Sequence, residues 1–465
     1  MIFEKHYNGA MNTSVSLTSG SISKNILIFS LPLMFTNMLQ VLFNMADVMV
    51  AGHFAGKLAL AGVGSTSMLI FLFTGFLIGL GSGINVLSAF YLGARNQKML
   101  DETVGTSFIF SLITGILFMI TGIVFARPIL ILMKTRPELL DNAVLYFKLY
   151  MIALPASAIY NCGNGILTSG GDTRRPLIIL SCAGVLNIGL NIFFVVFMKL
   201  SVAGVALGTV ISQYLSAGLI VFVLCKGEKF CTLPESDGFM GNVRLNFRNL
   251  HLSRNVFLRL IKLGIPAGFQ NAIFYVANIF IQVGVNHFDS AIIAGCAASH
   301  NAETITFDCM AAFYTAGASF TGQNYGAKKK NRILKSYLVS TGYAAIVSLI
   351  FGGIFLLFGR QFIGLFNGSR DVIEGGYIRL VIMALSMWIS APMDATTSAS
   401  RGLGKTAVPS LIIILGSCIF RIIWIYTIFA HFMTVRSLFI LFPVSWAITA
   451  FAEVLYFIRI YRRCQ

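Results

Sequence analysis

An acidic residue lies inside an apolar run near the start of the chain. Asp47, in FNMADVMVAGHFAG (43–56), is the only formal charge between Lys24 and Lys57. An ionised carboxylate in hydrocarbon costs at least about 2.5–3.5 kcal/mol, so an acid at that depth is expected to be functional unless a basic residue pairs with it. Such a carboxyl group can bind a proton or contribute to a site for a hard monovalent cation.

Amide and hydroxyl side chains are available to surround Asp47. Asn44 lies one turn before it on the same helix, and Asn187 and Asn191 in VLNIGLNIF fall four residues apart on one helix face. Thr209 in GVALGTVISQ adds a hydroxyl. Asp47, Asn187, Asn191 and Thr209 therefore predict an ion-coupling site for H+ or Na+. The alternative is a static hydrogen-bonded patch that locks the helices together.

The second half of the chain carries an acid in a different setting. Asp394 follows Pro392 in SAPMDATTSASRGLGK, where a break in the helix would expose backbone groups toward a cavity. Its counterpart in the first half is Asn161, so the two halves carry similar polar groups but different charge. One acid among many amides suits cationic, amphipathic cargo. The alternative is that Asp394 pairs with Arg379 or Arg421 for structural reasons.

Other ionisable residues fall within apolar runs. Glu303 follows His300 by three residues, so the two share one helix face, and Glu303 is expected either to line a cavity or to form a buried ion pair. Asp308 points to another face of the same helix and is a weaker candidate. Structural roles are expected for three further charged residues. Lys148 and Arg379 are expected to extend their side chains to the membrane surface, and Glu453 is expected to be structural as well.

The composition is typical of an integral membrane protein. The chain is 57% hydrophobic and 11% charged with a mean hydropathy of +0.82, whereas a soluble domain is about 25% charged. Runs of the ~20 apolar residues that a helix needs to cross a bilayer recur along the chain. Twelve spans are expected, near 25–50, 58–91, 103–126, 140–167, 174–198, 202–225, 256–286, 291–325, 335–359, 372–400, 405–430 and 436–458. The predicted fold class is an all-α integral membrane protein.

The net charge of +17 does not indicate a nucleic-acid partner. Basic residues gather on alternate loops, in KKKNR (328–332), RNQK (95–98) and RRPL (174–177), which places these loops and both termini in the cytoplasm. No Walker loop occurs, so no ATP is expected to drive movement. The eight Cys show no CxxC or His–Cys cluster, so neither disulfides nor a metal are expected.

The chain repeats itself once. LGAR (92–95) matches YGAK (325–328), and GDTRRP (171–176) matches GKTAVP (404–409) at the same offset. Two parallel six-helix lobes are therefore expected: a cytoplasmic tail over 1–23, an N-lobe over 24–225, a cytoplasmic linker over 226–255, and a C-lobe with a short tail over 256–465. Parallel repeats of this kind are typical of secondary transporters that alternate access to a central cavity.

Longer motifs resemble a known family. Pro32 with MADVMVAG, LGIPAGFQNAIFYVANIFIQ (263–282), ASFTGQNYGAKK (318–329) and PMDATTSASRGLGK (392–405) are similar to the multidrug and toxic compound extrusion (MATE) transporters, in the bacterial branch with the key acid in span one. The resemblance implies a V-shaped pair of lobes. It also implies export of cationic or amphipathic drugs in exchange for inward-moving protons or sodium.

The family's functional residues match only in part. In that branch the span-one acid, here Asp47, is thought to act with an Asn, an Asp and a Thr. Asn187 and Thr209 match, but Asn191 replaces the Asp and removes one negative charge that the sodium site of the branch contains. A second family site pairs a span-ten Asp, here Asp394, with a span-seven Glu that falls near Phe274. The expected cavity residues are Asn44, Asn161, Gln270, Asn271, Asn278, Glu303 and Asp394.

Two other functions fit parts of the sequence. A flippase for lipid-linked saccharides would require a cationic groove to hold pyrophosphate, whereas acids and amides predominate at depth here. A membrane receptor or assembly factor without transport would not require Asp47 to titrate. The favoured interpretation is a secondary active multidrug efflux transporter in the inner membrane. We expect it to be a monomer, not an enzyme, and to need no cofactor.

Overall fold

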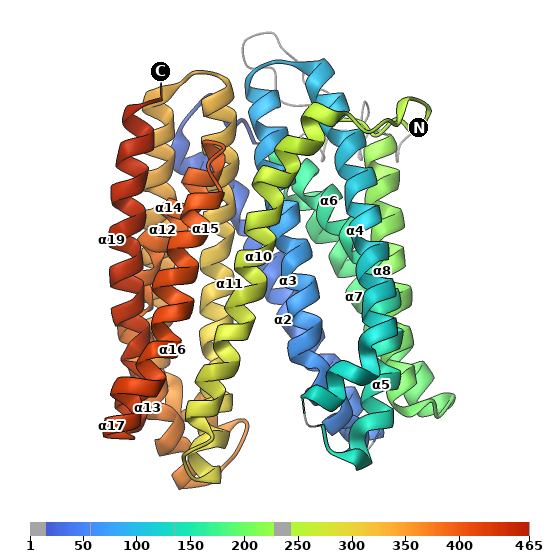
Figure 1. The fold of residues 1–465 in the computed structure, drawn as a ribbon, viewed down its shortest axis with the longest axis vertical. Coiled ribbons are helices and arrows are strands. Elements are labelled where there is room, and N and C mark those ends of the chain that lie inside the picture. The colour runs from blue at the N-terminus through green and yellow to red at the C-terminus, as the bar shows by residue number, and fades with distance from the viewer. Residues whose placement is uncertain (1–14, 56, 134, 227–242, 465) are drawn as a thin grey trace, which may run out of the picture. The chain divides into compact units, whose positions relative to one another are not determined.

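Helices form all the regular structure of the residues that the computed structural model describes, 15–55, 57–133, 135–226 and 243–464 (Figure 1). The first half contains α2 (Ile22–Val50), η1 (Ala51–Ala55), α3 (Lys57–Gly93), α4 (Gln97–Leu132), α5 (Pro137–Ile152), α6 (Leu154–Ser169), α7 (Arg174–Ile192), η2 (Phe193–Phe197) and α8 (Ser201–Cys225). The predicted all-α fold is confirmed.

The second half repeats the long helices with more interruptions. It contains η3 (Phe247–Asn249), α10 (Arg254–Val285), α11 (Ser290–Gly326), α12 (Lys330–Gly364), α13 (Arg370–Ser386), η4 (Met387–Ile389), α14 (Ser390–Gly402), α15 (Ala407–Ile413), η5 (Ile414–Ile419), α16 (Phe420–Trp424), η6 (Ile425–Phe429), α17 (Ala430–Phe432), α18 (Val435–Phe439) and α19 (Leu441–Arg462). The helix break expected at the Ser/Thr-rich segment after Pro392 is wrong, because α14 runs without interruption from Ser390 to Gly402. The interruption is a short 3-10 turn, η4, which lies directly before α14.

Backbone conformation supports the internal repeat. Arg95 and Lys328 both have positive φ, at 55° and 58°. They are the last residues of the matching motifs LGAR and YGAK. Gly171 and Gly404 both have positive φ as well, at 88° and 77°. Each pair is 233 residues apart, and each lies just after a long helix ends, where a left-handed residue turns the chain. Matching sequence motifs therefore form matching turns.

Ten helices of the described chain are long and apolar enough to cross a membrane, or eleven when α5 and α6, bent by 43°, count as one span. The expected span 291–325 is not among them, although α11 covers it with 37 residues. α11 packs against α12, α13 and α14. Because it faces protein more than lipid, it tolerates more polar residues than the helices that pass the hydropathy test. Two buried polar residues of α11, Ser299 and Glu303, bond to Gly376 and Arg379 of α13.

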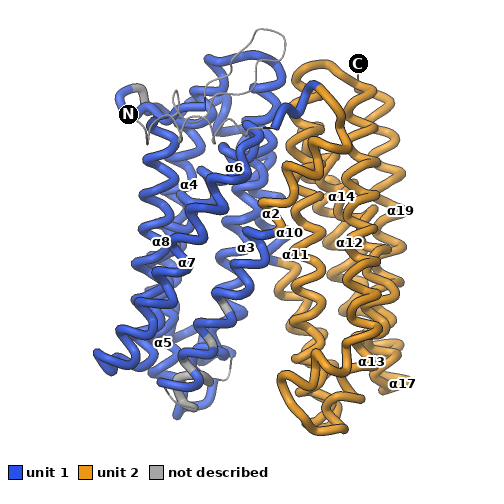
Figure 2. Tube along the Cα trace, turned by 180° about the vertical axis from the view of Figure 1, so that it is seen from behind, with its two compact units in different colours: residues 1–19, 35–272 blue, residues 20–34, 273–465 orange. Residues whose placement is uncertain are grey.

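The chain divides into two compact units (Figure 2). In the described ranges, one unit contains Phe35–Ala272 and the residues before Gly20, and the other contains Gly20–Met34 and the residues from Ile273 onward. These limits differ from the expected lobe boundaries at 24–225 and 256–465. The difference arises because the first helix of each half, α2 and α10, changes unit along its length.

Direct contacts explain why the beginning of α2 belongs to the second unit. The hydroxyls of Ser23 and Tyr343 lie 2.5 Å apart, and the rings of Phe29 and Phe320 meet edge to face with centroids 5.6 Å apart. The beginning of α10 belongs to the first unit because its backbone lies directly on α3. A Cβ atom placed on Gly83 of α3 would be 2.7 Å from the Cα atom of Gly264.

Candidate ion-coupling site

The side chain of Asp47 meets two other helices of the first unit. Asp47 lies near the end of α2, where its Oδ1 atom accepts a hydrogen bond from Nδ2 of Asn191 on α7 at 2.5 Å. Its Oδ2 atom accepts from the hydroxyl of Thr209 on α8 at 3.4 Å. The structure therefore brings together three of the four residues predicted for the ion-coupling site.

The fourth predicted residue completes the cluster. Asn187 lies one turn before Asn191, and its Oδ1 atom accepts from Nδ2 of Asn191 at 3.4 Å while its own Nδ2 atom donates to Oγ1 of Thr209 at 3.4 Å. Asn187, Asn191 and Thr209 are all buried, and Asp47 is partly buried. We call these four residues the Asp47 cluster.

Glycines on α7 and α8 allow this close approach. A methyl group on Gly208, one residue before Thr209, would overlap Oδ1 of Asn191. A methyl group on Gly184 of α7 would overlap the ring of Phe43 on α2. Small residues at such crossings let transmembrane helices pack closely, so the sequence builds the cluster with glycines as well as with polar side chains.

No Lys or Arg of the described chain forms an ion pair with Asp47. Its carboxyl group is held by amide and hydroxyl donors alone, which stabilise a negative charge less than a guanidinium would. The carboxylate also interacts electrostatically with Tyr146 and Tyr150 of α5. Sequence analysis missed these two tyrosines, because nothing in YFKLY separates them from ordinary membrane aromatics.

The cluster has the donor and acceptor set to hold a small cation. A proton can add directly to a carboxyl oxygen of Asp47. A larger ion would need the oxygen atoms of both amides, and Oδ1 of Asn191 is buried without a hydrogen-bond donor in the described residues. Because Nδ2 of Asn191 now points at Asp47, its amide would have to rotate to present that oxygen. The side chain of Asn44 lies outside the described residues.

The acid of the second unit, Asp394, lies in a separate cluster. It is partly buried on α14 and interacts electrostatically with Arg401 and Arg421, two arginines that are themselves buried. Its Oδ2 atom accepts no hydrogen bond from the described residues. The expected alternative of pairing with Arg379 is wrong, because Arg379 is engaged elsewhere.

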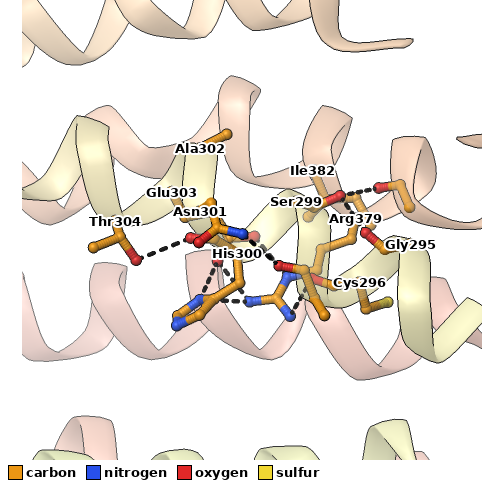
Figure 3. Close-up of polar contacts among 12 residues, drawn as sticks. Gly295, Cys296, Ser299, His300, Asn301, Ala302, Glu303, Thr304, Arg379 and Ile382 are labelled. Atoms are coloured by element: carbon orange, nitrogen blue, oxygen red, sulfur yellow. Dashed lines mark hydrogen bonds and ion pairs between the residues drawn. The ribbon is translucent and has the colours of Figure 1, made fainter. Parts of the chain in front are cut away.

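Arg379 and Glu303 form a buried ion pair (Figure 3). Nε and Nη2 of Arg379 each donate to one oxygen of Glu303 at 2.6 Å, and Nη2 also lies 3.2 Å from Nδ1 of His300. The guanidinium stacks on Phe439 at 4.7 Å. The prediction that Arg379 extends to the membrane surface is therefore wrong, whereas Lys148 is exposed as expected. Of the two alternatives for Glu303, the structure shows the ion pair.

The amides expected to line a cavity occupy positions in both units. Asn161 donates to the carbonyl of Ser157 at 2.9 Å, and Asn271 donates to the carbonyl of Gly75 at 3.3 Å. Gln270 is buried in the first unit, and Asn278 is partly buried in the second. Each amide therefore has a defined place on α6 or α10, and their role toward cargo stays a prediction.

Comparison with known proteins identifies relatives along most of the chain. The MatE family model matches twice, over residues 32–193 and 266–427, one match in each half. The probable multidrug resistance protein YoeA of Bacillus subtilis is 25% identical over 396 residues, which cover 84% of both chains. The probable multidrug resistance protein NorM of Thermotoga maritima is 26% identical over 406 residues, covering 84% of this chain and 82% of its own.

Solved structures share the fold. One described as an outward-facing conformation of a multidrug resistance MATE transporter of the MOP superfamily matches with a TM-score of 0.88 and 22% identity, covering 98% of this chain and 99% of its own. A MOP superfamily transporter from Pyrococcus furiosus, described as having a binding pocket of reverse polarity, matches with a TM-score of 0.87 and 23% identity over the same shares. At this identity the likeness establishes the fold.

Proposed function

Because this chain belongs to the MatE family of multidrug and toxic compound extrusion transporters, we propose that it exports cationic or amphipathic compounds in exchange for inward-moving protons. Family membership makes the chain a multi-pass membrane protein of the multidrug efflux class. The proposal adds the ion, the residues that bind it and the chemical class of cargo.

One observation carries the proposal: the carboxyl group of Asp47 is partly buried, accepts hydrogen bonds from an amide and a hydroxyl, and has no ion-pair partner in the described chain. An acid in this setting changes its charge more easily than one clamped by a guanidinium, because burial disfavours the ionised form and no positive charge offsets that cost. Binding and release of a proton at Asp47 therefore change the charge inside the first unit by one.

The chemistry of the cluster favours a proton over sodium. The Asp47 cluster contains one formal negative charge, and Asn191 presents an N–H group to the carboxylate rather than an oxygen to a metal ion. Sodium binding would require the amide to rotate and would be supported by one carboxylate only. Sodium coupling is the alternative that the experiments below distinguish.

Protonation would change how α2 packs against α7 and α8. A protonated carboxyl group offers one hydrogen-bond donor of its own, so the bonds from Asn191 and Thr209 must rearrange. The rearranged hydrogen bonds favour a different position of the end of α2. If the inward-open and outward-open states differ in that position, proton binding shifts the equilibrium between them. Each proton that moves inward contributes about 2.3 kcal/mol per 100 mV of membrane potential.

The remaining parts of the proposal concern cargo and membrane placement. The candidates for cargo binding are Asn161, Gln270 and Asn271 in the first unit, and Asn278 and Asp394 in the second. We also propose that the protein lies in the inner membrane with both termini in the cytoplasm, an orientation that the distribution of Lys and Arg among the loops supports. A monomer is sufficient, because both lobes belong to one chain.

The flippase alternative has no observation in its favour. It requires a cationic groove that can hold pyrophosphate, whereas each of the buried arginines Arg379, Arg401 and Arg421 interacts with an acid of the same unit. Arg379 is paired with Glu303, while Arg401 and Arg421 interact electrostatically with acids of the same unit.

Loss of the Asp47 charge tests the proposal. Cells that express the Asp47→Asn variant should accumulate a fluorescent cationic dye to the level of cells that lack the transporter, because the variant cannot bind the coupling proton. Asp141→Asn is the matched control, since Asp141 is an exposed acid whose side chain is 84% accessible. It should export dye like the unmodified protein. Normal efflux by Asp47→Asn at equal protein level would remove Asp47 from the mechanism, as the receptor alternative predicts.

A further inference from the structure

The second unit contains a buried carboxyl group that the proposed cycle does not use. Glu453 on α19 is fully buried, with 0% of its surface exposed. Neither of its carboxyl oxygens accepts a hydrogen bond from the described residues. Buried polar groups are nearly always hydrogen-bonded, so the structural role expected from the sequence does not account for this carboxyl group.

Charged groups approach Glu453 mainly from α14, which packs against α19. Arg401 and Asp394, both on α14, interact with Glu453 electrostatically. Arg421 on α16 in turn interacts with Asp394. Two acids and two arginines thus share one buried region of the second unit, although Glu453 receives no hydrogen bond from either arginine.

The other elements around α19 bring no further strong charge to Glu453. Cys418 of η5 faces Arg421, and Tyr456 on α19 itself interacts with Glu453. The helices α15 and η4 contain no charged residue. Arg379 of α13 is engaged by Glu303.

The guanidinium of Arg421 is held by neutral groups. Its Nε atom donates to the hydroxyl of Ser445 at 3.1 Å, and its plane lies over the ring of Phe442 at 4.4 Å. The rings of Phe274 and Trp446 lie at 5.4 and 5.9 Å. Arg421 is therefore positioned by aromatic rings and a hydroxyl, and not by a carboxylate of the cluster.

A hydroxyl group beside Glu453 is set up to accept a hydrogen bond. Thr397 on α14 interacts with the Glu453 carboxyl group. The hydroxyl hydrogen of Thr397 is directed to the carbonyl of Met393 at 3.0 Å, so it is not available to Glu453. A hydroxyl has one hydrogen but two acceptor lone pairs. The free lone pairs of Thr397 can therefore accept a hydrogen bond from a protonated Glu453.

These contacts favour a neutral Glu453. An ionised carboxylate without donors, taken out of water, costs several kcal/mol, whereas a protonated carboxyl group avoids most of that cost. A protonated group can also donate to Thr397. The alternative is that two carboxylates and two guanidinium groups form a neutral quartet, but such a quartet is expected to show direct charge-assisted hydrogen bonds.

A line of hydroxyl groups leads along α19 from Glu453. Ser445, Thr449 and Glu453 follow one another at intervals of four residues, so they share one face, and all three are buried. Thr449 lies 3.1 Å from the hydroxyl of Ser417 on η5, and Ser445 accepts from Arg421. This polar face connects Glu453 with the residues that surround Asp394.

We propose that Glu453 is a second proton-binding acid of this protein and is neutral in this structure, with the carboxylate of Asp394 and the guanidinium groups of Arg401 and Arg421 as charged neighbours. Its ligand is a proton, because neither of its carboxyl oxygens accepts a hydrogen bond from the described residues. The use of this proton in the transport cycle rests on the proposed function, but the binding itself does not.

Infrared spectroscopy of the purified full-length protein tests the proposal, because a protonated carboxyl group absorbs at a higher C=O frequency than a carboxylate. Protein labelled with 13C-glutamate should lose intensity from the protonated-carboxyl region at neutral pH and gain it at the isotope-shifted frequency. Glu303 is ion-paired, so it should not contribute to that band. This measurement needs no substitution and does not depend on whether a variant folds.

Substitution then assigns the band. Glu453→Gln should remove the glutamate band and leave thermal stability close to that of the unmodified protein, because glutamine resembles the protonated acid. The matched control is Glu374→Gln, since Glu374 is exposed and paired with Arg360, and it should leave the band unchanged. No protonated glutamate band, or a band that persists in Glu453→Gln, would overturn the proposal. A Glu453 band in a protein whose efflux does not depend on Asp47 would contradict only the proposed coupling site.

Discussion

The carboxyl group of Asp47 differs from those of Glu303, Asp394 and Glu453 in what surrounds it. Glu303 is clamped by Arg379, and Asp394 and Glu453 share two arginines. Asp47 has only an amide and a hydroxyl as donors. A site whose charge must change during a cycle is better served by weak neutral donors than by a fixed counter-charge, because the latter holds the acid ionised.

At the residue scale, Gly208 should be necessary for the Asp47 cluster. Gly208→Ala should lower efflux and destabilise the protein by about 1–3 kcal/mol, because the added methyl overlaps Oδ1 of Asn191 and forces the amide away from Asp47. Dye efflux and thermal unfolding of the purified variant measure the two effects.

Gly218 on the same helix provides the control for that prediction. A methyl group there meets no atom within 4 Å. Gly218→Ala should keep full efflux and gain up to about 1 kcal/mol of helix propensity. Equal behaviour of the two variants would show that the contact between Gly208 and Asn191 does not shape the site.

The buried ion pair supports a second prediction at this scale. Arg379→Met should destabilise the protein by roughly 3–5 kcal/mol, since it leaves Glu303 charged and buried without a partner. Combining it with Glu303→Gln should recover part of the loss. Thermal unfolding measures both, and Arg360→Met, which breaks the exposed pair with Glu374, should cause little change. A mild effect of Arg379→Met would mean that water reaches Glu303.

Residues of the site could be predicted from the sequence where their spacing along a helix indicated a shared face. Asn187, Asn191 and Thr209 were predicted with Asp47, because an i, i+4 pattern and a resemblance both pointed to them. Asn191 and Thr209 donate hydrogen bonds to Asp47, and Asn187 bonds to both of these residues. The partner of Glu303 was not predicted, because it lies 76 residues away and basic residues at span ends usually extend to water. The close contact between Gly208 and Asn191 and the residues around Glu453 could not be predicted from a single sequence.

At the scale of elements, glycines fix the crossing of α3 and α10 within the first unit. A Cβ atom on Gly83 would lie 2.7 Å from Cα and 2.8 Å from N of Gly264, both backbone atoms that cannot move aside without shifting α10. Gly83→Ala should therefore lower thermal stability and efflux together.

The same helix again offers a matched control. Gly64 of α3 has no atom within 4 Å of an added Cβ, so Gly64→Ala should behave like the unmodified protein in both measurements. If Gly83→Ala is as stable as Gly64→Ala, the two helices are not held together at this crossing.

Element boundaries were predicted where apolar runs are continuous. The expected span 103–126 falls within α4, and 335–359 falls within α12. The polar helix α11 is the exception to the hydropathy test, because neighbouring helices replace lipid around it. Interruptions such as η4, η5 and η6 depend on packing against other helices and were not predictable from the sequence.

At the scale of the whole molecule, duplication was the most reliable sequence signal. Motifs at one offset predicted two halves, and positive-φ residues recur at the same offset in the structure. The limits of the compact units were not predicted, because hydropathy shows where a helix crosses the membrane but not which neighbours it contacts. Both α2 and α10 change unit along their length, which gives each unit a segment of the other half.

Export by this molecule should therefore be driven by protons through Asp47. The most direct test is transport by purified protein in liposomes, with a pH gradient or a sodium gradient imposed separately and a fluorescent cation as cargo. We expect the pH gradient alone to drive transport by the unmodified protein, and Asp47→Asn to show no response to it. Transport driven by sodium alone, or an equal response of Asp47→Asn to the pH gradient, would contradict the account.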